Sequence, residues 1–95
     1  MAVEAERRQV TILFTDMVGF TAFSEAAGEE AAFRLMRDVA RLTGDVVREQ
    51  GGAVQNFTGD GLMAVFGAPV AYEDAPARAC RAALGIIERL DGAAD

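Results

Sequence analysis

The chain has 95 residues, of which 52% are hydrophobic and 25% charged, a composition typical of one small globular domain rather than a disordered segment. Its formal net charge of −6, with no lysine, excludes a nucleic-acid binder that relies on a basic surface. A single cysteine, Cys80, excludes an internal disulfide. The absence of histidine removes the usual general base and the usual zinc ligand.

The sequence shows neither the pattern of a secretory signal nor that of a membrane-spanning segment. The first residues contain no apolar stretch before a cleavage site, and no apolar run reaches the roughly 18 residues of a membrane span. We therefore expect a cytoplasmic domain with no membrane insertion in this chain. Cys80 lies among Ala79, Ala82 and Ala83, so we expect a small packing residue rather than a reactive thiol.

The first half of the chain predicts one strand and two helices. Residues 10–14 are β-branched and aromatic and lead to Asp16, which indicates a buried strand with a functional end. Gly19 marks a turn, and residues 21–27 then have the pattern of a short helix ending near Gly28.

Residues 29–50 carry apolar side chains at helical spacing, so they predict a long amphipathic helix that stops at Gly51 and Gly52. Phe33 and Met36 belong to this apolar stripe, and we expect both in the core. The arginines of this helix are expected on its solvated side.

The second half predicts a hairpin and a further helix. Residues 53–57 and 62–66 have strand character and are joined by Thr58-Gly59-Asp60-Gly61, a turn sequence. Residues 73–90 form a second amphipathic pattern with an alanine-rich and isoleucine-rich apolar side.

This order, β-α-α-β-β-α, predicts an α+β fold of the ferredoxin-like kind, with helices on one face of a mainly antiparallel sheet. A ferredoxin-like motif normally closes with another strand, which these residues do not supply. We therefore expect an open sheet edge that pairs with another chain.

Two carboxylates follow apolar strand-like runs: Asp16 and Asp60. Paired carboxylates are suited to hard cations, and a glycine turn at a helix start can bind phosphate through backbone amides. Each residue has an ordinary alternative, because Asp16 could cap a helix and Asp60 could be a turn residue. Their combination points to a metal-dependent nucleotide phosphoryl site.

At these residues the chain resembles the class III adenylyl/guanylyl cyclase catalytic domain. Three segments carry the resemblance: residues 10–21 (VTILFTDMVGFT), 56–69 (NFTGDGLMAVFGAP) and 73–83 (EDAPARACRAA). It extends over residues 8–90, which correspond to the N-terminal half of the family domain. The resemblance thus implies a truncated nucleotide-cyclase fold, with possible additional C-terminal domains in the full protein.

The resemblance implies that Asp16 and Asp60 are catalytic through two divalent cations per site, Mg²⁺ or Mn²⁺. Met17 would contribute its backbone carbonyl to one cation. Such ions would activate the ribose 3′-hydroxyl and neutralise the leaving pyrophosphate, as in other two-metal sites. The implied substrate is ATP or GTP, the product a 3′,5′-cyclic nucleotide used in intracellular signalling, and the implied assembly a homodimer.

The same resemblance assigns the backbone amides of Val18, Gly19, Phe20 and Thr21 to the β- and γ-phosphates. It places Asn56 at the position that reads the purine base, where active family members usually have lysine. Asparagine brings no charge and has a shorter reach, so this departure leaves base selectivity and activity open.

The family's transition-state asparagine and arginine belong to the half that these residues do not match, so we expect this chain alone to be inactive. Two other interpretations remain open. The chain is alternatively a non-catalytic cyclase-like module that binds nucleotide and regulates a larger signalling protein through dimerisation, or an assembly unit whose sheet edge pairs between chains.

Overall fold

The computed structural model describes residues 9–58 and 60–94. The described part contains three strands and three helices in the expected β-α-α-β-β-α order. Their bounds are β1 Thr11–Asp16, α1 Phe20–Ala27, α2 Glu29–Glu49, β2 Ala53–Thr58, β3 Gly61–Phe66 and α3 Ala75–Ala94. The predicted elements are therefore confirmed, and the largest shifts in their bounds are at the ends of β1 and α3.

The three strands form one antiparallel sheet in the order β1-β3-β2. The central strand β3 pairs with β1 from Thr11 opposite Phe66 to Asp16 opposite Gly61. On its other side β3 pairs with β2, with a register shift between Val54 and Asn56. The α+β prediction with an antiparallel sheet is confirmed.

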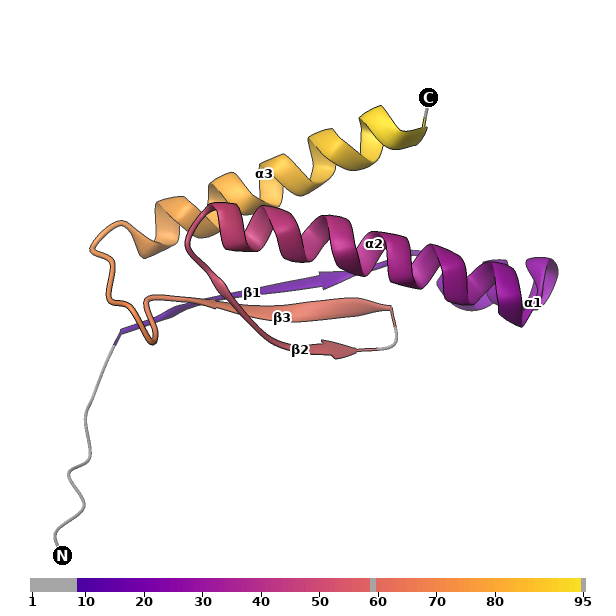
Figure 1. Ribbon diagram of the computed structural model, residues 1–95, viewed down its shortest axis with the longest axis horizontal. Helices are drawn as coiled ribbons and strands as arrows, with labels where there is room; N and C mark the ends of the chain where they lie inside the picture. The colour runs from indigo at the N-terminus through magenta and orange to yellow at the C-terminus, as the bar shows by residue number, and fades with distance from the viewer. Residues whose placement is uncertain (1–8, 59, 95) are drawn as a thin grey trace, which may run out of the picture.

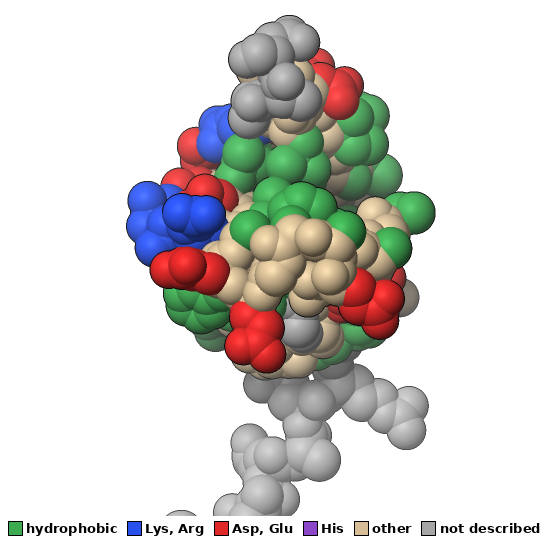
Figure 2. Space-filling model, turned by 90° about the vertical axis from the view of Figure 1, so that its right-hand side faces the viewer, with side chains coloured by type: hydrophobic (Ala, Val, Ile, Leu, Met, Phe, Trp, Pro, Cys, Tyr) green, Lys and Arg blue, Asp and Glu red, His purple; other side chains and the backbone are tan. Residues whose placement is uncertain are grey.

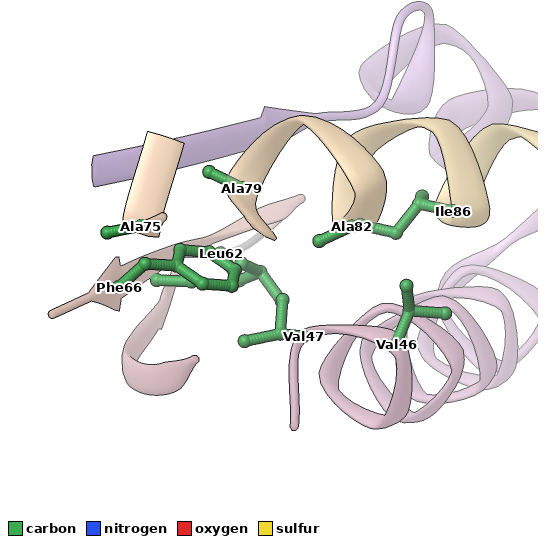
Figure 3. Packing of buried hydrophobic residues seen from close by; sticks show 9 residues of the cluster. Val46, Val47, Leu62, Phe66, Ala75, Ala79, Ala82 and Ile86 are labelled. Atoms are coloured by element: carbon green, nitrogen blue, oxygen red, sulfur yellow. The ribbon is translucent and has the colours of Figure 1, made fainter. Parts of the chain in front are cut away.

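Helices α2 and α3 run side by side on one face of the sheet, and α1 lies against the N-terminal end of α2, beyond the ends of the strands (Figure 1). The core lies between these two helices and the sheet. Figure 3 shows Ala75, Ala79, Ala82 and Ile86 of α3 facing side chains of β3 and α2. The largest fully buried side chains are Phe66, Leu62 and Val47. Because small alanines line α3, it packs closely on the large residues of β3.

The opposite face of the sheet carries apolar side chains that the helices do not cover. In β1, Ile12 and Phe14 are 49% and 69% exposed, whereas Leu13, between them in sequence, packs against the core. This alternation follows from the two-residue repeat of a strand. That an open edge of the sheet pairs with another chain stays a prediction.

Three expectations about burial are wrong. The expectation of a buried strand does not hold for β1, whose residues alternate between partly buried and exposed because only one of its faces meets the helices. Cys80 is exposed, because the inward side of α3 is defined by Ala75, Ala79 and Ala82 and the next residue along a helix points about 100° away. Phe33 is 58% exposed, because it lies in the N-terminal half of α2, beyond the part that α3 covers.

The α3 helix begins two residues later than expected, and Asp74 precedes it. The Asp74 carboxylate accepts a 2.8 Å hydrogen bond from Arg78 Nε. Arg78 also donates to the Gln50 carbonyl over 3.1 Å and stacks on the Tyr72 ring. These contacts fix the start of α3 to the end of α2. No helix in the described ranges is long and apolar enough to cross a membrane.

Candidate functional site

The candidate site is at the end of the sheet where β1 finishes and β3 begins. Asp16, the last residue of β1, lies directly opposite Gly61, the first residue of β3. The amide of the next residue, Met17, donates a 2.9 Å hydrogen bond to the backbone carbonyl of Asp60. Strand register and this hydrogen bond thus bring together two segments that are far apart in the sequence.

Gly61 makes this close approach possible. A Cβ atom at position 61 would lie 1.8 Å from the carbonyl oxygen of Thr15 and 3.1 Å from the Cα of Asp16. Since the obstacle is backbone, no side-chain rotation relieves the clash. The glycine after Asp60 is therefore a steric requirement for the pairing that places the two carboxylates side by side.

The two carboxylates interact directly. The Asp60 carboxyl raises the pKa of Asp16 above its ordinary value of 3.8, first through a hydrogen bond between the two carboxyls and then through repulsion between their charges. A smaller desolvation effect adds to the increase, and a backbone hydrogen bond from Met17 opposes it. Like charges held this close favour a proton or a cation between them.

The donor set fits a hard divalent cation. Two carboxylates with a nearby backbone carbonyl supply the oxygen ligands that Mg²⁺ and Mn²⁺ prefer, and Mg²⁺ commonly takes only one or two protein carboxylates and completes its shell with water and phosphates. In the described part of the chain, no group of three or more His, Cys, Asp or Glu side chains is placed to hold a metal.

The turn after Asp16 leads straight into α1. Gly19 adopts a left-handed conformation with φ 77° and precedes the first residue of the helix, Phe20. The helix has no side-chain cap at this end and no acidic residue in its first turn. Its first amides thus have no competing side-chain acceptor, which suits binding of an anion. Val18, in the turn, has a fully exposed side chain.

Asn56 lies on β2, opposite Met63 of β3, just after the register shift. Met63 is in turn opposite Phe14 of β1, so Asn56 is on the face of the sheet away from the helices. Phe14 and Asp16 are two residues apart on one strand and therefore share that face. The structure thus brings Asn56 to the same face as Asp16. Gly59 lies outside the described residues.

Sequence reasoning missed Thr15. Its hydroxyl accepts a 3.0 Å hydrogen bond from the backbone amide of Leu62, which ties β1 to β3 next to the carboxylates. One signal was available: a polar residue at an inward-facing strand position needs a partner. The partner itself depends on the strand register, which the sequence did not define to the residue.

Figure 2 looks onto this end of the molecule and shows acidic side chains around its rim, with a basic cluster on one side. The arrangement agrees with the net charge of −6. An acidic surface of this kind favours metal-bound rather than free nucleotide.

Residues 3–94 match the family model for the adenylate and guanylate cyclase catalytic domain. Among curated proteins, the chain is 37% identical over 87 residues to adenylate cyclase 1 of Rhizobium meliloti (strain 1021), covering 92% of this chain and 13% of that protein. It is 39% identical over 62 residues to the adenylate cyclase of Anabaena cylindrica, covering 65% of this chain and 12% of that protein.

Solved structures with a similar fold are cyclases as well. The adenylyl cyclase CyaB from P. aeruginosa superposes with a TM-score of 0.87 at 25% identity, covering 94% of this chain and 46% of that one. The guanylate cyclase domain of RhGC from Catenaria anguillulae was solved in complex with GTP. It superposes with a TM-score of 0.81 at 27% identity, covering 86% of this chain and 45% of that one. The chain thus spans about half the length of these solved chains and about an eighth of its curated relatives. It belongs to the adenylate and guanylate cyclase catalytic domain family.

Proposed function

We propose that this chain carries the cation-binding half of a purine-nucleotide cyclase site, which converts ATP or GTP to a 3′,5′-cyclic nucleotide and pyrophosphate for intracellular signalling. The observation that carries the proposal is the pairing of Asp16 with Asp60, held by the Met17 amide at 2.9 Å from the Asp60 carbonyl. Family membership supports the reaction class, and residues 8–90 are proposed as the first half of the catalytic domain.

In this proposal Asp16, Asp60 and the backbone carbonyl of Met17 hold Mg²⁺ or Mn²⁺, two ions per site. Such ions supply charge neutralisation at the phosphates and make the ribose 3′-hydroxyl a better nucleophile. The chain's contribution is to hold the backbone of Asp16, the last residue of β1, beside that of Asp60, which immediately precedes β3.

The other groups bind and orient the substrate. The amides of Val18, Gly19, Phe20 and Thr21 would hold the β- and γ-phosphates at the start of α1, where the helix dipole favours negative charge. Asn56 would contact the base from β2. In the reaction, the 3′-oxygen bonds to the α-phosphorus, the bond from that phosphorus to the pyrophosphate oxygen breaks, and the hydroxyl proton is released.

A homodimer is part of the proposal for the whole protein. One similar guanylyl cyclase domain, from Blastocladiella emersonii, has been solved both as a dimer and as a monomer. The residues that stabilise the transition state would come from outside the matched half, so the 95-residue chain alone is expected to bind cations without turnover. The cytoplasmic location stays a prediction.

Asn56 favours a second candidate function. Without a cationic side chain at the base-reading position, the domain would bind nucleotide and signal through its dimer without turnover. Because both candidates use the same carboxylates, both predict cation binding. They differ only in whether a cyclic product is formed.

The test is an assay of ATP and GTP turnover with Mn²⁺ on the full-length gene product, with Asp60→Ala as the control. Cyclic nucleotide formed by the wild type and lost in the variant supports the cyclase and defines the base preference. Nucleotide binding without product in the wild type contradicts turnover and supports the regulatory module.

A further inference from the structure

A concave region adjoins the candidate site on the helix-covered side of the sheet. It is a cavity of about 420 Å³ between the N-terminal half of α2 and the β2–β3 end of the sheet. This volume is within the roughly 300–1,000 Å³ of small-molecule sites. Met17 and Asp60, two of the proposed cation ligands, line part of this cavity, whereas the phosphates and the base are proposed at the α1 turn and on the opposite face of the sheet.

The walls of the cavity are mostly apolar. Phe33, Met36 and Val39 of α2 form one side, and Phe57 of β2 faces them. Phe33 and Phe57 are 58% and 52% exposed, so two aromatic rings on opposite walls remain in water. A ligand between them would remove apolar surface from water, which is the main driving force for filling such a site.

The polar groups of the cavity are largely used by the protein itself. The Thr43 hydroxyl donates to the Val39 carbonyl over 2.8 Å, and the Thr15 hydroxyl accepts from the Leu62 amide. No buried side-chain nitrogen or oxygen within the described residues lacks a partner. Because its walls are mostly apolar and two of its hydroxyls are already bonded, the interior suits an alkyl or aromatic ligand body.

Two charged residues define which head group fits. Arg37 lines the cavity, and its side chain is 54% exposed, with a 3.4 Å contact to the neighbouring Asp38. Asp60 lines the cavity too, and its carboxyl interacts with Asp16. An anionic head group is attracted by Arg37 at the open side and repelled by Asp60, so it lies at Arg37 with its apolar body inside.

We infer that this cavity is a binding site for a small amphipathic carboxylate, with Arg37 contacting the carboxylate and the rings of Phe33 and Phe57 enclosing the apolar body. Because Thr15, Asp60 and Gly61 also line the cavity, a bound ligand contacts the residues that position the cation pair. The site therefore has the location of a regulatory site.

The methionines provide an internal control for its detection. Met17 and Met36 line the cavity, whereas Met63 pairs with Phe14 and Asn56 on the other face of the sheet. Octanoate is the probe, and methionine methyl resonances of the 95-residue chain are the readout. Saturable shifts of Met17 and Met36 with Met63 unmoved are expected; no shift, or equal shifts of all three, overturns the site.

Two variants on the same helix test the head group. Arg37→Gln is expected to weaken octanoate binding about fivefold, the size of an exposed ion pair, and to leave binding of neutral 1-octanol unchanged. Arg34→Gln, on α2 but outside the cavity lining, is expected to change neither. Equal effects of the two variants overturn carboxylate recognition. Methyl shifts that depend on protein concentration without ligand mean that a second copy covers the cavity, which also overturns the proposal.

Discussion

The hydroxyl of Thr15 accepts a 3.0 Å hydrogen bond from the backbone amide of Leu62, and the two residues are direct partners in the β1–β3 register. Thr15 is adjacent to Asp16, and Leu62 is two residues from Asp60. The bond makes Thr15 a positioning residue for the cation pair, because a slip of β1 against β3 would separate Asp16 from Asp60.

Removing that hydroxyl should therefore weaken both the sheet and the cation site. We expect Thr15→Val to lower the free energy of unfolding by about 0.5–1.5 kcal/mol, the net contribution of one hydrogen bond, and to weaken Mn²⁺ binding. Urea unfolding and Mn²⁺ titration measure the two effects. Thr15→Ser keeps the hydroxyl and should retain Mn²⁺ affinity; equal losses in both variants would show that the hydroxyl is not the cause.

Gly61→Ala should be the most damaging alanine substitution among the glycines that the structure describes. The added Cβ would lie 1.8 Å from the Thr15 carbonyl oxygen, so the end of the β1–β3 pair must open. A loss of more than about 2 kcal/mol in unfolding free energy is expected, together with loss of Mn²⁺ binding.

Gly92→Ala is the matched control, since a Cβ at position 92 meets nothing within 4 Å. In helix α3 this change should stabilise by up to about 1 kcal/mol. Comparable destabilisation by the two substitutions in thermal unfolding would contradict the steric account.

The repulsion between Asp16 and Asp60 predicts that Mn²⁺ reverses which protein is the more stable, the wild type or a variant that lacks one of the carboxylates. Because the pKa of Asp16 is raised in the folded chain, the folded state holds its proton more tightly than the unfolded state does, and the charged pair costs stability at neutral pH. Without metal, Asp16→Asn should raise the melting temperature at pH 7.

That gain should shrink as the pH falls through the raised pKa towards 3.8, the ordinary value, where the wild type is protonated too. With saturating Mn²⁺ the wild type should become the more stable protein, because only its folded state binds the ion. Scanning calorimetry at two pH values with and without Mn²⁺ measures all four cases. A variant less stable than the wild type without metal would refute the repulsion.

The contribution of Asp74 to the stability of the fold should depend on pH in the opposite direction. Its hydrogen bond with Arg78 lowers the pKa of Asp74 below 3.8, so its stabilising effect is present above pH 3.8 and is lost as the pH falls through the lowered value. Asp74→Asn should reduce stability at pH 7 and make the acid-unfolding curve less steep.

The comparison is Asp45→Asn, whose contact with Arg48 is longer, 3.3 Å, and lies between side chains more than half exposed. Acid titration followed by circular dichroism compares the variants. If Asp45→Asn alters the curve as much as Asp74→Asn, the link between α2 and α3 does not depend on the Asp74–Arg78 pair.

Much of the fold could be predicted because the periodic signals were strong. The long helix predicted for residues 29–50 is α2, Glu29–Glu49, and the turn sequence around Asp60 did separate two paired strands. Strand β1 extends to Asp16, beyond its apolar run, because pairing with Gly61 continues it. Strand ends depend on a partner and not on composition alone.

Burial and side-chain partners were harder to predict. Helical periodicity put Phe33 on the core stripe without showing where the covering elements end, and nearby alanines suggested a packed Cys80 that is exposed. The site pairing was anticipated from the resemblance. Its physical basis, a backbone contact that only Gly61 permits and a hydroxyl contact at Thr15, requires the register of β1 on β3.

The central claim is that Asp16 and Asp60 form one cation site. It is tested most directly by Mn²⁺ titration of the wild type, Asp16→Asn, Asp60→Asn and the double variant of the 95-residue chain. For a shared site, each single substitution should weaken binding about as much as both together, since either loss breaks the same coordination. If the two single losses simply add, or if either variant keeps the wild-type affinity, the carboxylates do not hold one ion and the account is wrong.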